Sequence, residues 1–107
     1  MKVVIRTAAR RDILSQVAYL IDELAYDVAL RFPNAVDEGI RQFRKNPGIG
    51  SPKRLRNPRL KGLRAWPVPG FEDMRIYYLQ PGEKTLRIVR VLHGRRDVQS
   101  ILEREQG

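Results

Sequence analysis

The chain has 107 residues, which is enough for one hydrophobic core, so we expect a single domain over residues 1–107. It contains no cysteine and one histidine, which excludes a disulfide framework and a thiolate or histidine-rich metal site, and we expect no cofactor. Its 21 lysines and arginines against 12 aspartates and glutamates give a formal net charge of +9. Such a charge favours an anionic partner, whether nucleic acid, an acidic polypeptide or a membrane surface.

The N-terminal segment predicts a strand followed by a helix. Residues 2–6 are short, apolar and β-branched, which is typical of a strand. We expect Thr7 to be the N-cap of an amphipathic helix over residues 8–25, because apolar residues recur there at three- and four-residue spacing. The apolar run Val3–Ile5 is too short for a signal peptide core, and no later run approaches membrane-spanning length. We therefore expect a cytoplasmic protein that does not enter a membrane.

A second helix is expected to follow at once, because Asp27 can cap it and a helical apolar stripe continues to Asn46. Pro33 lies inside this stripe and would cost about 3 kcal/mol in a regular helix interior. Since the stripe stays in phase across Pro33, one kinked helix is favoured over two short ones. The two helices should pack as an antiparallel hairpin that covers a sheet.

Residues 46–62 form a loop that we call the basic loop. They hold three prolines, three glycines and five lysines or arginines, and Leu55 and Leu60 are the expected anchors. Between Glu38 and Glu72 there is no acidic residue. The basic residues in that window are Arg41, Arg44, Lys45, Lys53, Arg54, Arg56, Arg59, Lys61 and Arg64. Such a run is often only a solvated surface, but nine cations without one intervening acid favour a docking role.

Residues 63–68 predict an edge strand that ends near Pro67, with Trp66 as a core or loop-anchoring aromatic rather than a platform for stacking bases. The main strand follows, with Met74, Ile76 and Tyr78 on one face and Asp73, Arg75 and Tyr77 on the other. This alternation predicts a half-buried strand.

A turn is expected at residues 80–84, which contain Pro81 and Gly82. Residues 85–92 are apolar on both faces, which predicts a central strand paired antiparallel to the main strand. A polar cluster, His93 to Asp97, closes this hairpin. Asp97 can cap a last helix over residues 98–104 that folds back on the sheet through Ile101 and Leu102.

The segments LRAWPVPGFEDMRIYYL and LRIVRVLHGRRDVQSIL resemble the RelE/ParE superfamily of bacterial toxins. The second segment is similar to the ParE branch, whose last main strand ends in the pattern R-V-L-H-G-x-R-D, here Arg90 to Asp97. The resemblance covers nearly the whole chain. It implies an α+β fold in which an N-terminal strand and a helical hairpin pack on a small, twisted, mostly antiparallel sheet with a short C-terminal helix.

The resemblance also implies a toxin held inactive in a hetero-oligomeric complex with a cognate antitoxin of the ParD type. ParE-like members target DNA gyrase and block replication, whereas RelE-like members cleave mRNA in the ribosomal A site. Because these two fates share a fold, the fold does not choose between them.

Metal-free RNA cleavage needs a group that takes the proton of the 2′-hydroxyl, cations that hold the phosphate, and an acid for the leaving oxygen. Lys61, Arg75, and Arg95 or Arg96 match the basic positions of RelE-like enzymes, but the chain has no tyrosine after Tyr78. His93 could replace the missing proton carrier. The alternative, which we favour, is that His93 hydrogen-bonds to backbone and positions the turn at Gly94, with Asp97 as an N-cap.

The sequence thus predicts a ParE-like gyrase inhibitor with no catalytic residue, and a RelE-like ribosome-dependent mRNA endonuclease is the alternative, with Lys61, Arg75, His93 and Arg95 as its catalytic residues. The expected polar centre is Arg75, His93, Arg95 and Arg96. The expected electrostatic surround is Lys53, Arg54, Arg56, Arg59 and Lys61. No DNA-reading motif is recognisable, although a non-specific affinity for phosphate is expected.

Overall fold

The computed structural model describes residues 1–105, and within them one five-stranded sheet has the strand order β1-β5-β4-β3-β2. The strands are β1 (Lys2–Ile5), β2 (Ser51–Pro52), β3 (Arg64–Val68), β4 (Phe71–Gly82) and β5 (Thr85–His93). The helices are α1 (Thr7–Glu23), α2 (Tyr26–Lys45), α3 (Val98–Glu103) and a 3₁₀ turn at Pro58–Leu60. β1 pairs parallel with β5 and the other pairs are antiparallel, which confirms the predicted α+β fold.

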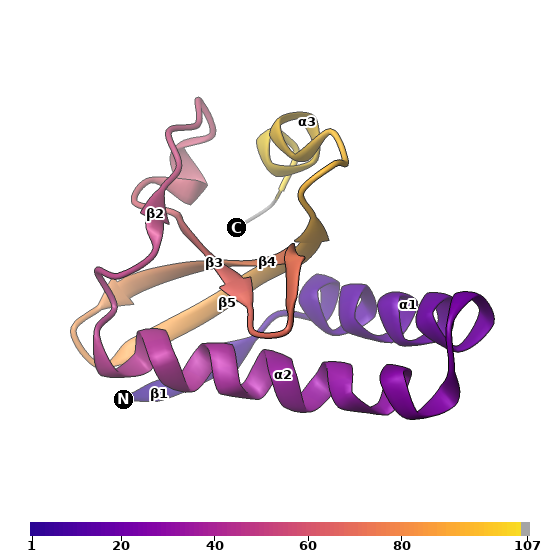
Figure 1. Ribbon diagram of the computed structural model, residues 1–107. Coiled ribbons are helices and arrows are strands. Elements are labelled where there is room, and N and C mark those ends of the chain that lie inside the picture. The colour runs from indigo at the N-terminus through magenta and orange to yellow at the C-terminus, as the bar shows by residue number, and fades with distance from the viewer. Residues whose placement is uncertain (106–107) are drawn as a thin grey trace.

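The central strand β5 is covered on both faces, as predicted. Helices α1 and α2 cover one face of the sheet, which we call the helix face, and there Leu86, Ile88 and Val91 join the larger apolar core. The basic loop and α3 lie on the opposite side, the loop face (Figure 1). On that face Val89 and Leu92 belong to a second, smaller core. β5 therefore lies between two apolar cores, one under α1 and α2 and one under the basic loop and α3.

β4 alternates as predicted, with Met74, Ile76 and Tyr78 in the helix-face core. The expectation that its other face is open was wrong in part, because Tyr77 and Leu79 are buried on the loop face. Leucines of the basic loop and of α3 cover them, and sequence alternation does not register such cover from distant segments. β4 also extends to Gly82, which shortens the predicted turn to two residues.

The predicted N-caps of the first two helices, Thr7 and Asp27, were wrong. α1 begins at Thr7, and its N-cap is Arg6, which makes no side-chain cap. The N–H of Arg6 donates to the carbonyl of Ile88 at 3.0 Å, so pairing with the sheet fixes where the chain turns into the helix. α2 begins at Tyr26 after Ala25, and Asp27 lies inside its first turn, where a negative charge complements the helix dipole.

α2 is one helix through Pro33, as predicted, and it packs closely on the sheet. At Gly39 an added Cβ would lie 2.9 Å from Ile76 Cδ1, so the small residue permits this approach. Trp66 is anchored against the same helix, since its indole N–H donates to Gln42 Oε1 at 2.7 Å. This confirms Trp66 as an anchoring aromatic.

β1 pairs only with residues 85–88 of β5, and charged side chains cover the edge of β5 that follows. Asp12 of α1 accepts from the backbone N–H of Val91 at 2.9 Å and from Arg90 Nε and Nη2 at 2.7 and 2.8 Å. Arg90 also forms an ion pair with Glu105. The hydrogen bonds to Asp12 raise the pKa of Arg90 against the opposing effect of burial, and Glu105 adds to the rise. This cluster ties α1 and the C-terminal segment to the central strand.

The start of the basic loop is fixed by the side chain of Tyr78. Its hydroxyl accepts from the N–H of Gly50 at 3.0 Å and donates to the carbonyl of Pro47 at 2.7 Å. The ring stacks on Phe43 of α2, with ring centroids 3.9 Å apart and planes within 6°. The loop therefore begins at a fixed point of the core.

We expect the substitution Gly50→Ala to lower the free energy of unfolding by about 1–3 kcal/mol, because it overpacks this junction. An added Cβ would lie 2.5 Å from Tyr78 Oη and 3.0 Å from the carbonyl oxygen of Ala65. Urea denaturation measures the change. The matched control is Gly48→Ala, where the nearest atom is Asn46 Oδ1 at 3.8 Å, and equal effects of both substitutions would contradict the packing argument.

Candidate functional site

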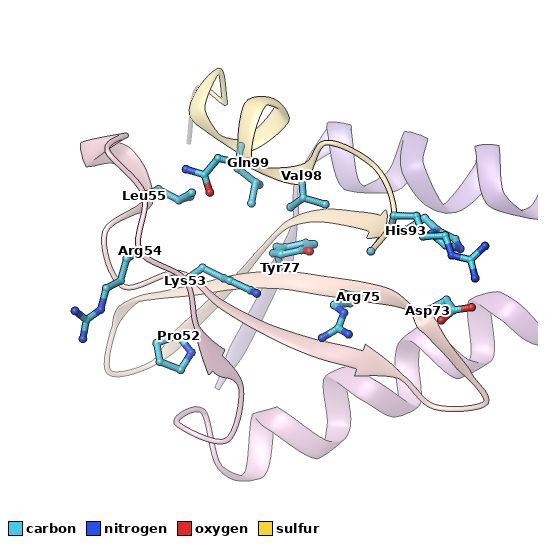
Figure 2. Close-up of a pocket in the computed structure, with 13 residues that line it drawn as sticks. Pro52, Lys53, Arg54, Leu55, Asp73, Arg75, Tyr77, His93, Val98 and Gln99 are labelled. Atoms are coloured by element: carbon cyan, nitrogen blue, oxygen red, sulfur yellow. Dashed lines mark hydrogen bonds between the residues drawn. The ribbon is translucent and has the colours of Figure 1, made fainter.

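A cleft of about 510 Å³ opens on the loop face where β4 begins and β5 ends, and we call it the His93 cleft. Met74 pairs with His93 and Arg75 with Leu92, so the two strands bring their polar ends together. In Figure 2 residues 53–55 of the basic loop form one wall and α3 forms the other, while Arg75 and Tyr77 lie on the strand between them. The cleft is thus built from three separate parts of the chain.

Arg75 is held in the cleft by the turn that follows β5. The N–H of Gly94 donates to the carbonyl of Asp73 at 2.7 Å, which closes the turn over the start of β4. A Cβ at Gly94 would lie 3.5 Å from Arg75 Nε, so the turn packs directly on this guanidinium. The turn at Gly94 and the side chain of Arg75 therefore lie side by side in the cleft.

His93 makes the backbone hydrogen bond that its structural role requires. Its Nδ1 accepts from the N–H of Arg95 at 3.0 Å, which assigns the ring proton of the neutral imidazole to Nε2. Asp97 follows as the N-cap of α3, accepting from the N–H of Ser100 at 3.2 Å, and hydrogen bonds from the side chain and then the backbone of Ser100 lower the pKa of its carboxyl. Both contacts set the backbone of the turn.

Tyr77 lies in the cleft and was not among the predicted site residues. It is 2% exposed, and burial raises the pKa of its phenol, while the neighbouring charge of Arg75 acts in the opposite direction. A signal for it exists in the sequence, because Tyr77 is two residues from Arg75 and strand alternation puts both on one face.

Hydrogen bonds of Asn57 and Glu103 join the basic loop to the segment around α3, the two walls of the cleft, and we call these bonds the clamp. The side-chain amide of Asn57 donates to the carbonyls of Leu102 and Glu105 at 3.0 and 2.8 Å. In return, the carboxylate of Glu103 accepts from the backbone N–H groups of Arg56 and Asn57 at 3.1 and 2.9 Å. The basic loop and α3 therefore form one unit, and the width of the cleft depends on this clamp.

The structure brings together part of the predicted set. Lys53, Arg54, Arg75, His93 and Arg95 line the cleft. Figure 2 shows the amine of Lys53 extending toward Arg75, whereas the guanidinium of Arg54 points away from the cleft. Arg56 and Arg96 are exposed and are not among the residues that line the cleft in the described chain.

Arg59 and Lys61 lie elsewhere. They line a second depression of about 340 Å³, which we call the Arg64 hollow, together with Arg64 and Arg87. Leu79 and Gln80 also line it, so it lies at the far end of β4 from His93. Lys61 is therefore separated from Arg75, His93 and Arg95, the residues that the nuclease alternative would join to it.

Residues 1–105 contain neither a metal-binding cluster of side chains nor a helix that could span a membrane. No group of three His, Cys, Asp or Glu side chains is placed to hold a metal ion there. None of the helices in that range has the length and apolar character to cross a membrane.

The chain is similar to known proteins in sequence family and in fold. A family model described as the ParE toxin of the type II toxin–antitoxin system, parDE, matches residues 3–98. The fold is similar to a solved structure described as the chromosomal ParDE TA system from P. aeruginosa, with a TM-score of 0.69 over 87% of this chain and 95% of that chain. Their sequence identity is 15%, so this likeness shows the fold alone. No curated protein sequence matches the chain.

We expect Asn57→Asp to loosen the clamp. The new carboxylate keeps the oxygen that accepts from the N–H of Arg59, but it loses the N–H groups that bind the carbonyls beside α3. The free energy of unfolding should fall by about 1–3 kcal/mol, and amide exchange should accelerate in both α3 and the basic loop. Asn46→Asp, the same substitution at an exposed position of the basic loop, is the control. If Asn57→Asp leaves the exchange of α3 unchanged, the clamp does not hold the wall.

Proposed function

The chain belongs to the ParE toxin family of type II toxin–antitoxin systems, and on this premise we propose that it inhibits DNA gyrase in the cytoplasm and so blocks replication and growth. The observation that carries the proposal is the family match, which spans residues 3–98 and so includes all of the sheet except Lys2 and most of the residues that line the His93 cleft. The chemistry of the cleft bears on how the toxin acts.

The cleft supports inhibition by binding rather than RNA cleavage. Its cations could hold a phosphate, but neither His93 nor Tyr77 is suited to take a proton from a hydroxyl. Nδ1 of His93 is engaged by the N–H of Arg95. Burial raises the pKa of Tyr77, which keeps the phenol protonated at neutral pH, and Lys61 lies in the Arg64 hollow.

In this proposal Arg75, His93 and Arg95 form the polar centre that contacts the target, with Arg96 beside it on the exposed turn. Arginine side chains that are held in place before binding lose little freedom on contact, and they are common hot spots of protein interfaces. Arg75, packed under Gly94, fits that description best. The electrostatic surround comprises Lys53, Arg54, Arg56, Arg59 and Lys61.

We expect Arg75→Ala to raise the toxin concentration needed for half-inhibition of gyrase supercoiling by about tenfold or more, which corresponds to about 1.4 kcal/mol of binding free energy. Arg31→Ala is the matched control, because Arg31 is an exposed arginine of α2 and its removal changes the net charge equally. The assay uses purified toxin, gyrase and relaxed plasmid. Equal loss with both variants would mean that only net charge matters.

An unaffected gyrase would contradict the proposal outright. If wild-type toxin leaves supercoiling intact and instead produces toxin-dependent cuts in ribosome-bound mRNA, the RelE-like endonuclease becomes the function. The same purified protein serves both assays, so one preparation distinguishes the two targets.

We also propose that a ParD-like antitoxin binds the helical hairpin. Six of the large apolar side chains that the structure leaves exposed lie on or between α1 and α2, and Leu14 and Leu24 are 69% and 67% exposed. The six are Leu14, Tyr19, Ile21, Leu24, Tyr26 and Leu30. Exposed apolar surface of this kind marks a protein interaction site and makes the free protein prone to self-association.

We expect Leu14→Asp to weaken the complex with the cognate ParD-like antitoxin by about tenfold or more, because it puts a charge into an apolar contact. Ser15→Asp is the control, since it adds the same charge at the next exposed position of α1. Titration calorimetry with the two purified proteins measures the affinity. Unchanged affinity for Leu14→Asp would place the antitoxin on another surface.

A further inference from the structure

The positive charge of the chain lies outside the helical hairpin. The helical hairpin, residues 7–45, contains six lysines and arginines and six aspartates and glutamates, so it is neutral as a unit. The net charge of +9 therefore arises entirely from the strands, the basic loop and the C-terminal segment. Long-range attraction of phosphates therefore acts on the loop face and on the sheet, whereas a partner held by apolar contacts can bind the neutral hairpin.

Exposed apolar side chains are concentrated on the neutral hairpin rather than on the cationic part of the chain. Among residues 1–105, the large apolar side chains left exposed outside the hairpin region are Met1, Val4 and Ile49. Ile49 lies next to Trp66 and Gln42, on the side of the basic loop that faces α2. The cationic loop face thus lacks the large apolar anchors that most protein–protein interfaces have at their centre.

The basic loop runs from the His93 cleft to the Arg64 hollow. We call these two cationic depressions, together with the loop between them, the band. The loop contributes Lys53 to the His93 cleft, beside Arg75, and Lys61 to the Arg64 hollow, beside Arg64. The two depressions are lined by opposite ends of β4, with Arg75 at one end and Leu79 at the other. Four residues of strand separate these positions, a distance of about 13 Å.

We propose that this band binds the phosphate backbone of duplex DNA without reading its sequence. One strand of B-DNA carries a phosphate about every 3.4 Å along the helix axis, so the band spans about four phosphates. Arginine and lysine are the residues that contact phosphates, and interfaces with DNA are polar and strongly positive, as the loop face is. This inference concerns a ligand of the toxin itself and does not depend on gyrase being its target.

Duplex DNA fits the face better than a single strand does. Proteins that hold single strands without sequence preference stack the bases on exposed aromatic side chains. The tyrosines of β4, Tyr77 and Tyr78, are 2% and 1% exposed, and Trp66 is engaged with Gln42. In the described chain the exposed aromatic residues, Tyr19 and Tyr26, belong to the helical hairpin, so the band offers cations without a stacking surface.

Fluorescence anisotropy with the purified chain and a labelled duplex of about 20 base pairs, over a range of salt concentrations, tests the proposal. The association constant should fall linearly with salt on a log–log plot. Lys53→Ala and Lys61→Ala, one in each depression, should each reduce the magnitude of that slope by about 0.9. Arg31→Ala on the neutral hairpin removes the same charge and should leave the slope unchanged.

Several outcomes would overturn the proposal. One is that the duplex does not bind at low salt, and another is that Arg31→Ala changes the salt slope as much as Lys53→Ala and Lys61→Ala do. A third is that a single strand of the same length binds more tightly than the duplex. The fourth is that polyglutamate displaces the duplex at equal charge concentration. The last result would assign the band to an acidic polypeptide. Because the assay contains no gyrase, its failure leaves the proposed inhibition standing, and the reverse also holds.

Discussion

The central strand β5 has apolar side chains on both faces, and the rest of the structure follows from the need to cover them. On one face a long amphipathic hairpin does so completely, burying Ile88 and Val91 under α1 and α2. On the other face the cover comes from the basic loop, which carries five cations, and from the short helix α3. These reach Val89 and Leu92 through a few leucines and leave the His93 cleft open beside them.

That incomplete cover also explains the charge distribution. A segment whose cations must stay in water can fold onto a sheet only through its few apolar and uncharged side chains, here Leu60 and Asn57. The partly buried Arg90 belongs to β5 instead and is paired with Asp12 and Glu105. The result is a neutral hairpin with exposed apolar side chains and a cationic loop face without them. In our account the hairpin serves the antitoxin and the loop face serves anionic and target contacts.

Sequence patterns predicted the elements where local chemistry decides, and failed where distant contacts decide. Alternation identified β4, and Asp97 caps α3 as expected. Thr7 failed as a cap because the pairing of Arg6 with Ile88 sets the start of α1, a contact across more than eighty residues. The partly wrong prediction for β4 has the same origin, because the loop-face cover of Tyr77 comes from segments remote in sequence.

The same distinction between local and distant contacts separates the site residues that could be predicted from those that could not. Arg75, His93 and Arg95 could be placed together because antiparallel pairing of two adjacent strands brings the start of one to the end of the other. Tyr77 was available from the same alternation. Lys61 was not, since the path of the basic loop is set by the clamp between Asn57 and Glu103 and by the hydroxyl of Tyr78. No sequence period reports such contacts.

Amide hydrogen exchange of the toxin with and without its antitoxin shows whether the surface is divided between two partners. If it is, the antitoxin should protect the exposed side of the hairpin, around Leu14 to Leu30, and leave exchange in the basic loop little changed. Protection concentrated in the basic loop and at His93 to Arg96, with the hairpin unaffected, would contradict this division.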